Sequence, residues 1–95
     1  MKQPAVYILT NKKHGTLYIG VTSQLPQRIW QHKQKLVDGF SKKYNCNLLV
    51  YYEQHKTMQE AILREKRLKA WKRAWKIRII EELNPNWEDL YENIL

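Results

Sequence analysis

The sequence predicts an α+β fold in which helices flank a three-stranded antiparallel sheet, in the element order β-β-α-β-α-α. Two short runs rich in β-branched and aromatic residues lie on either side of a short glycine-containing loop, as in a β-hairpin. A third such run comes later, and helical periodicity fills the stretches after the second and third runs. With 95 residues the chain can bury one modest core, which predicts a single domain.

The strand predictions rest on residue type and spacing. PAVYILT at residues 4–10 and TLYIGVT at residues 16–22 are separated by the turn-like NKKHG, and LLVYYE at residues 48–53 gives the third strand. Gly20 interrupts the second strand, which predicts either a bulge or a close approach by another group.

Capping and stop signals bound the first helix. Thr22 or Ser23 is expected to cap it, and Pro26 is tolerated in its first turn. The helical pattern reaches about Val37, and Asp38-Gly39 then stops it.

A capping box, Thr57-Met58-Gln59-Glu60, predicts that the second helical segment begins at Thr57. The pattern continues to about Leu83 and stops at Asn84-Pro85, with a break between Ala70 and Lys72 as an alternative. The domain is therefore expected over residues 1–83, followed by an acidic C-terminal tail over residues 84–95.

Charge is distributed unevenly along the chain. There are 17 Lys and Arg against 9 Asp and Glu, a net charge of +8. All 17 bases lie in residues 1–80 beside four acids, a balance of +13, whereas residues 81–95 hold five acids and no base. Such a basic body attracts phosphate and predicts nucleic acid as the partner; a lysine-rich surface that only keeps the protein in solution is the alternative. We expect the tail to pack on the domain through Trp87, Leu90, Tyr91 and Ile94.

Several classes of protein do not fit. No apolar run reaches the ~20 residues of a membrane span, and we expect no signal peptide, because Met-Lys-Gln-Pro leads into a strand without a small-residue cleavage site. Cys46 is the single cysteine, so no internal disulfide can form, and with three scattered histidines it lacks the spacing of a zinc site. We therefore expect a cytoplasmic protein.

Ionisable residues interrupt the inward faces of both helical segments. In the first, Leu25, Ile29 and Leu36 define an apolar stripe whose missing position is His32, with Arg28 one turn earlier. Charged groups are costly to bury unless they are paired, bind a metal or line a cleft.

The second helical segment has the same kind of interruption. Its apolar stripe consists of Met58, Ala61, Ile62 and Leu68. Glu65 stands at the centre of that stripe. The structural alternative is that Glu65 pairs with Arg28 or His32 and simply joins the helices.

Aromatic and basic residues add to the candidate site. Tyr7 and Tyr18 stand in the middle of the two hairpin strands, either as ordinary core tyrosines or as functional groups. From Lys66 to Arg78 basic residues alternate with Trp71 and Trp75, which we predict to face the core while the bases form a cationic outer face or a merely solvated one. The candidate nucleic-acid-binding residues are Lys12, Lys13, Lys66, Lys69, Lys72, Arg73 and Lys76.

Together these pieces resemble the GIY-YIG nuclease superfamily over roughly residues 5–83. The two motifs that name the family match Ala5-Val6-Tyr7, in which Ala replaces the family's Gly, and Tyr18-Ile19-Gly20. Its Arg-x-x-x-His motif matches Arg28 and His32. Its metal-binding helix matches Ala61-Ile62-Leu63-Arg64-Glu65. Small stand-alone members are the most similar, because they share Gly39-Phe40, Val50-Tyr51-Tyr52-Glu53, Arg64-Glu65-Lys66 and Asn84-Pro85-Asn86-Trp87.

The resemblance implies hydrolysis of a phosphodiester with one divalent ion, Mg²⁺ or Mn²⁺. Glu65 would be the sole protein ligand of that ion. Tyr7 would be the general base for the attacking water, provided that its surroundings lower its pKa, and Tyr18 would donate a hydrogen bond near the nucleophile. His32 would orient or assist a tyrosine, and Arg28 would stabilise charge on the phosphate.

We therefore predict a metal-dependent endonuclease that acts on DNA and selects structure rather than sequence, like relatives in DNA repair and branched-DNA resolution. One alternative is a basic nucleic-acid-binding module that retains the fold but has weak or partner-dependent activity. Another is a nucleoid- or RNA-associated protein whose Tyr and Glu residues are structural. Asn84 stays outside the predicted catalytic set, because Pro85 gives it a different context from the Asn of larger members.

Overall fold

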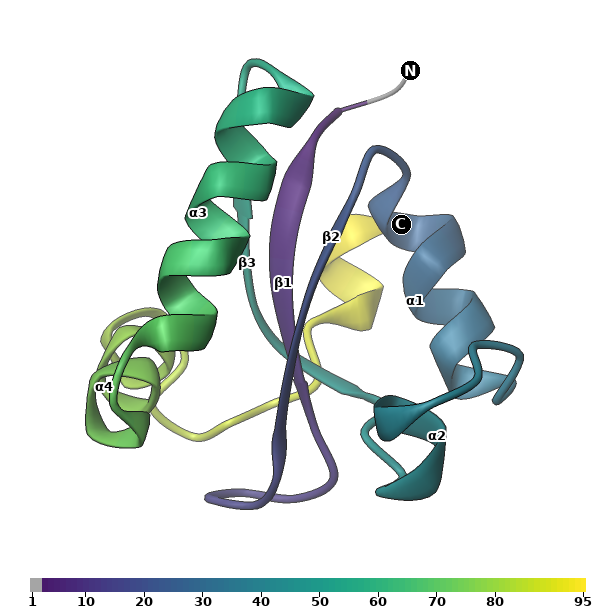
Figure 1. Cartoon of the computed structure of the whole chain (residues 1–95). Coiled ribbons are helices and arrows are strands. Elements are labelled where there is room, and N and C mark those ends of the chain that lie inside the picture. Colours follow the sequence, from purple (N-terminus) through teal and green to yellow (C-terminus); the bar gives the residue numbers. More distant parts are fainter. Residues whose placement is uncertain (1–2) are drawn as a thin grey trace.

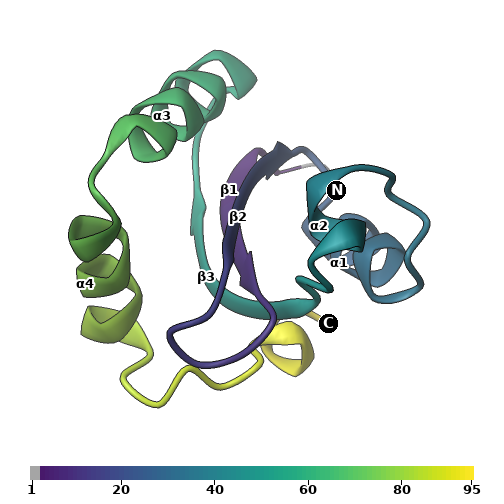
Figure 2. The ribbon, with the colours of Figure 1, turned by 60° about the horizontal axis from the view of Figure 1, so that its bottom comes forward.

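The computed structural model describes residues 3–95 and shows a three-stranded antiparallel sheet between two layers of helices (Figures 1 and 2). The strands are β1 (Ala5–Thr10), β2 (Leu17–Thr22) and β3 (Leu48–Gln54), and the sheet order is β2-β1-β3. The helices are α1 (Leu25–Lys33), α2 (Phe40–Lys43), α3 (Met58–Ala70), α4 (Arg73–Leu83) and the 3₁₀ turn η1 (Tyr91–Ile94). The predicted α+β class and order of the main elements are confirmed. Among the described residues, none of the helices is long and apolar enough to cross a membrane.

Each face of the sheet has its own core, because side chains alternate along the central strand β1. Ala5, Tyr7 and Leu9 point into the layer that contains α1 and η1, whereas Val6 and Ile8 pack toward α3 and α4. Figure 2 shows these two layers on opposite sides of the sheet. All six residues of β1 are buried, as expected for a strand that is covered on both faces.

The first helix is shorter than predicted and lacks the expected cap. α1 begins after Gln24, whose side chain makes no capping bond, and neither Thr22 nor Ser23 caps it. The helix ends at Lys33 because Lys35 adopts a left-handed conformation with φ of 58°. The amide of Lys35 then bonds to the carbonyl of His32, and the amide of Leu36 to that of Gln31, which is the Schellman arrangement.

This early stop moves one predicted core residue to the surface. Leu36 was expected on the inward stripe of the first helix, but it lies beyond the helix and is 62% exposed. Leu25, Ile29 and His32 occupy the buried face of α1 as predicted. The loop after α1 leads into the short helix α2, which was not predicted.

The second helical segment divides at Trp71, as the alternative prediction proposed. Thr57 caps α3 by accepting a hydrogen bond from the Glu60 amide at 3.2 Å, which confirms the predicted start of this helix, and the Thr57 hydroxyl donates to Oε2 of Glu60 at 3.3 Å. Trp71 and Lys72 have extended backbones, so α4 restarts with a different helical phase. Trp71 packs against the core, whereas Trp75 is 51% exposed and the prediction that it faces the core is wrong.

The stripe predicted for α3 is only partly buried. Ala61 and Leu68 are fully buried against the sheet, but Ile62 is 37% exposed and Met58 is half-buried. The inward face of α3 is therefore narrower than predicted.

The residues after α4 contact the outer side of β3. A register shift between Ile8 and Leu9 leaves Val50 as an extra residue in β3, and Asn84 Nδ2 donates to the Val50 carbonyl at 3.1 Å. The Asn84 side chain also makes two hydrogen bonds to the backbone of Glu88. Its Nδ2 donates to the Glu88 carbonyl at 2.8 Å, and its Oδ1 accepts from the Glu88 amide at 3.0 Å. Asn84 is therefore a buried backbone clamp, which explains its presence without a catalytic role.

Apolar residues of the tail contact both cores. Trp87 is buried in the core beneath α3 and α4, and Leu90, Tyr91 and Ile94 pack against the core on the other face. Lys33 of α1 forms an ion pair with Asp89, so an electrostatic contact also holds the tail on the domain.

Candidate active site

Tyr7 lies in the middle of β1, directly opposite Gly20 of β2. A Cβ atom at position 20 would lie 2.3 Å from Cζ of Tyr7 and 2.4 Å from its hydroxyl. Only glycine therefore allows the Tyr7 ring to cross the backbone of the edge strand. The group that was predicted to approach Gly20 closely is this tyrosine.

The Tyr7 hydroxyl lies in a chain of buried polar contacts. It is 2.9 Å from Nε2 of His32, and Nδ1 of His32 is 3.0 Å from Oγ of Ser41 on α2. His32 and Ser41 are each 4% exposed, and Tyr7 is 1% exposed. Each buried polar atom in this chain thus has a partner, which burial requires.

Burial sets the protonation states of this chain. Burial, and then the neighbouring Arg28 charge, lower the pKa of His32 to about 4, so His32 is neutral near pH 7. A neutral imidazole has one donor and one acceptor nitrogen, and the two contacts of His32 use both. Burial and Tyr18 raise the pKa of Tyr7 above its usual range, against the lowering effect of Arg28. Tyr7 is therefore a neutral phenol in the protein alone.

Tyr18 reaches the same cluster from β2. Its ring centroid is 5.2 Å from that of His32 and 6.3 Å from that of Tyr7. On its other side the ring stacks on Phe40 of α2, with centroids 6.4 Å apart and planes inclined by 24°. Tyr18 thus joins the buried polar chain to a more exposed aromatic surface.

Arg28 stands on α1, one turn before His32, and is half-buried. Its Nη1 atom contacts Oε1 of Gln31 at 3.4 Å, and no carboxylate within residues 3–95 forms an ion pair with it. Beside it lies an open pocket of about 320 Å³ lined by Thr22, Ser23, Gln24, Gln27, Arg28 and Gln31. A guanidinium without an acidic partner in an open polar pocket can bind an anion.

Glu65 lies on α3, between the buried residues Ala61 and Leu68, and 15% of its side chain is exposed. Its nearest ionic partner is Lys69, whose Nζ atom is 3.5 Å away. The ion pairs of the described chain do not join Glu65 to Arg28 or His32, so the structural salt bridge considered from the sequence is not formed. The pKa of Tyr7 is raised chiefly by burial and then by Tyr18, and the Glu65 charge adds a smaller effect in the same direction.

The donor set around Glu65 suits only a sparsely ligated cation. Within residues 3–95 no cluster of three His, Cys, Asp or Glu side chains could enclose a metal. Mg²⁺ commonly binds through one or two carboxylates and completes its shell with water and substrate phosphate. A single carboxylate at Glu65 therefore fits a hydrated ion of this kind and does not fit a structural zinc site.

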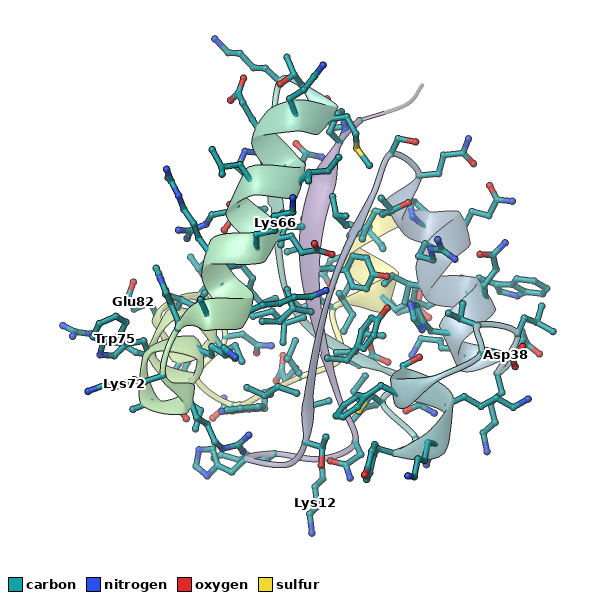
Figure 3. All side chains as sticks on the ribbon, viewed as in Figure 1. Lys12, Asp38, Lys66, Lys72, Trp75 and Glu82 are labelled. Carbon is teal, nitrogen blue, oxygen red and sulfur yellow. The ribbon has the colours of Figure 1, made fainter. Side chains whose placement is uncertain are left out.

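The predicted nucleic-acid-binding residues come from several elements of the fold. Lys69 and Lys76 line the same pocket next to Tyr18. Lys12 extends from the β1–β2 loop, whereas Lys72 points outward from the α4 side (Figure 3). Lys13 and Lys66 are exposed, but Arg73 donates to the backbone carbonyls of His14 and Gly15 and so holds the β1–β2 loop.

Two residues that contact the candidate site residues were not predicted from the sequence. Ser41 and Phe40 belong to α2, a four-residue helix that is too short to show periodicity. The only signal was their position after Gly39, within the segment shared with small relatives.

Comparisons with known proteins agree with this geometry. The family model described as "GIY-YIG catalytic domain" matches residues 3–78. A UPF0213 protein of Staphylococcus haemolyticus is 33% identical over 82 residues, which cover 86% of this chain and 99% of that protein. UPF0213 proteins of Bacillus pumilus and Staphylococcus aureus (strain Mu3) are each 32% identical, over 83% and 72% of this chain and 81% and 83% of their own lengths. No solved structure matches.

The family match covers Tyr7, Tyr18, Arg28, His32 and Glu65, and it supports nuclease-type hydrolysis at the level of the family. The chain belongs to the GIY-YIG catalytic domain family.

Proposed function

We propose that this protein is a metal-dependent endonuclease that hydrolyses phosphodiester bonds in DNA and selects its substrate by structure. The observation that carries the proposal is the buried hydrogen bond between the Tyr7 hydroxyl and a neutral His32, beside an Arg28 that forms no ion pair with any carboxylate of residues 3–95. A proton acceptor next to an anion-binding group is what attack of water on a phosphodiester requires.

The protonation states favour a relay over a free tyrosinate. Tyr7 is protonated, and its hydroxyl contacts Nε2 of His32. We infer that Tyr7 takes a proton from the attacking water while it passes its own proton to His32. The hydroxide forms the new P–O bond as the bond to the leaving oxygen breaks.

Binding of a phosphate would assist this relay. The Arg28 charge helps to hold the pKa of His32 low. When a phosphate neutralises that charge, the lowering effect weakens and His32 becomes a better base. Arg28 would hold the phosphate through two parallel N–H bonds, which lysine cannot provide.

Glu65 is the residue proposed to hold Mg²⁺ or Mn²⁺. When bound, such an ion stabilises negative charge on the leaving oxygen. The Lys69 ammonium that now pairs with Glu65 lies at the surface, so it can release the carboxylate.

Binding that does not depend on base sequence is supported by the charge distribution. The balance of +13 in residues 1–80 attracts phosphate regardless of sequence. The side chains of the cluster are suited to phosphate contacts, which position a nucleic acid but carry no sequence information directly.

The proposal is tested with labelled DNA and RNA structures, including duplex, nicked, flapped and branched forms, incubated with Mg²⁺, Mn²⁺ or EDTA. We expect cleavage of DNA that EDTA abolishes. Glu65→Gln should keep the fold and DNA affinity but lose cleavage, and Tyr7→Phe should do the same because only the hydroxyl is removed.

Two results would contradict this assignment. A Glu65→Gln protein that is destabilised but whose folded fraction cleaves normally would make Glu65 structural. Tight, salt-sensitive DNA binding without cleavage of any substrate would favour the binding module, whose affinity also falls steeply with salt.

A further inference from the structure

A groove next to the proposed site has the composition of a base-binding surface. Its volume is about 260 Å³, close to the lower end of the ~300–1,000 Å³ that small-molecule sites occupy. The lining residues are Leu17, Tyr18, Ile19, Phe40, Lys69 and Lys76. They come from β2, α2, α3 and α4, so the groove crosses the edge strand of the sheet between the two helical layers.

One wall of the groove is aromatic and accessible. Phe40 stacks on Tyr18, yet 46% of Phe40 remains exposed. Phe40 also packs on Tyr44, with ring centroids 4.6 Å apart, which holds its ring in place. A supported but half-exposed aromatic ring offers a face on which another flat group can stack.

The other wall of the groove is cationic. Lys69 and Lys76 line it, and Nζ of Lys76 donates to the carbonyl of Lys69 at 3.2 Å. Burial and the neighbouring Arg73 lower the pKa of Lys76, so an anion in the groove would favour its charged form. Aromatic faces beside lysines are the combination with which proteins bind single-stranded nucleic acid.

The groove is continuous with the proposed site at two points. Tyr18 belongs to both, because its ring also lies 5.2 Å from that of His32. Lys69 lines the groove and is the ion-pair partner of Glu65. A nucleotide in the groove would therefore be a neighbour of the phosphate to be cut.

We propose that this groove binds one unpaired nucleotide, with its base stacked on Phe40 and its phosphate near Lys69 and Lys76. The proposal rests on the proposed nuclease function and specifies its substrate class. That class is DNA in which a single-stranded nucleotide adjoins the scissile phosphate, such as an overhang, flap or branch point. A base inside an intact duplex is already stacked on its neighbours and cannot enter the groove without unpairing.

The test compares three DNAs in EDTA, where cleavage is excluded. They are a blunt duplex, the same duplex with an overhang that begins with 2-aminopurine, and that duplex with an abasic site in place of the 2-aminopurine. Overhangs of both polarities are used. The abasic overhang carries the same phosphates without the base, so the ratio of the two overhang affinities isolates stacking.

We expect the base-bearing overhang of one polarity to bind about 5- to 150-fold more tightly than its abasic counterpart, the range that stacking of one base gives. Its 2-aminopurine fluorescence should be quenched on binding. Phe40→Leu should bring the ratio close to one, because it keeps an apolar side chain but removes the ring. Phe40→Tyr should preserve the ratio.

Trp75→Ala is the control, because Trp75 is about as exposed as Phe40, at 51% against 46%, but points outward from the α4 side (Figure 3). It should leave the ratio unchanged. Thermal melting of each variant verifies that the proteins compared are folded, and exposure of Phe40 makes a large loss of stability unexpected.

Either of two results overturns the inference: a wild-type ratio near one for both polarities, or a large ratio that Phe40→Leu retains. Failure of the nuclease proposal looks different. A ratio well above one that requires Phe40, without cleavage of any DNA in Mg²⁺ or Mn²⁺, would contradict the nuclease function but support base binding in the groove. Metal-dependent cleavage with a ratio near one would support the nuclease function and contradict base binding in the groove.

Discussion

Nε of Arg64 lies 3.1 Å from both carboxylate oxygens of Glu53. This contact ties α3 to β3 at the residue before Glu65. Tyr51 and His55 donate to the same carboxylate, each at 2.6 Å. Burial alone would raise the pKa of Glu53, but these hydrogen bonds and the Arg64 charge hold that pKa below its usual value. The clamp therefore fixes how α3 sits on the sheet and, with it, where Glu65 points.

Replacing Arg64 with Met should weaken the fold, because it leaves a largely buried Glu53 carboxylate with fewer partners. We expect the free energy of unfolding to fall by about 1–3 kcal/mol in urea denaturation. Arg67→Met is the control, since Arg67 is exposed one turn later, and its effect should stay within about 0.5 kcal/mol. Equal losses in the two variants would show that the clamp contributes nothing specific.

His32 should make the protein sensitive to mild acid. Burial and Arg28 lower its pKa to about 4 in the folded protein, against about 6.5 in an unfolded chain. Between these values only the unfolded chain binds the proton, so stability falls as the pH drops from about 6.5 and levels off near 4. The loss attributable to His32 should reach up to about 3 kcal/mol. In urea unfolding across this pH range, the free energy of unfolding should depend less on pH for His32→Gln than for the wild-type protein. Parallel curves for the variant and the wild type would contradict the prediction.

Gly20→Ala should displace the Tyr7 ring, because the new methyl group would lie 2.3 Å from Cζ of Tyr7. We expect a cost of about 1–3 kcal/mol in stability and a marked loss of any cleavage activity, since the Tyr7–His32 bond is broken. The same substitution made in a Tyr7→Ala background should cost much less. Additive costs in the two backgrounds would mean that the clash is relieved elsewhere.

Ser41→Ala should leave Nδ1 of His32 without its partner and free the imidazole to rotate or change tautomer. Cleavage should fall at least about tenfold while DNA affinity stays unchanged. Nitrogen chemical shifts of His32 give a separate readout, because they report the tautomer and the pKa of the ring. Normal activity with unchanged shifts would show that Ser41 only fills space.

The strands and the inward polar residues could be predicted, because both follow from local sequence patterns. Runs of β-branched and aromatic residues indicated the strands, and the gaps in the helical stripes pointed to His32 and Glu65. That these gaps mark a functional cluster came from the family resemblance, since periodicity alone left the structural salt bridge open.

The features that were not predicted depend on uncommon backbone conformations or on very short elements. Lys35 ends α1 in a left-handed conformation that usually takes glycine, so no residue type before Asp38-Gly39 signalled the end of the helix. The α2 helix is a single turn, and Ser41 could be found only in three dimensions. Trp75 does not face the core as predicted, because the extended backbones of Trp71 and Lys72 change the helical phase between α3 and α4.

The contacts of the tail with β3 have a consequence beyond stability. β3 is an outer strand, and its free side is where a strand from another molecule could add to the sheet. The Leu49 amide donates to Oδ1 of Asp89 at 3.2 Å, and the Leu49 carbonyl accepts from the Leu90 amide at 2.7 Å. An incoming strand would have to displace both bonds and the adjoining apolar contacts. The tail thus covers this edge of the sheet, the β3 side, against pairing with a strand of another copy.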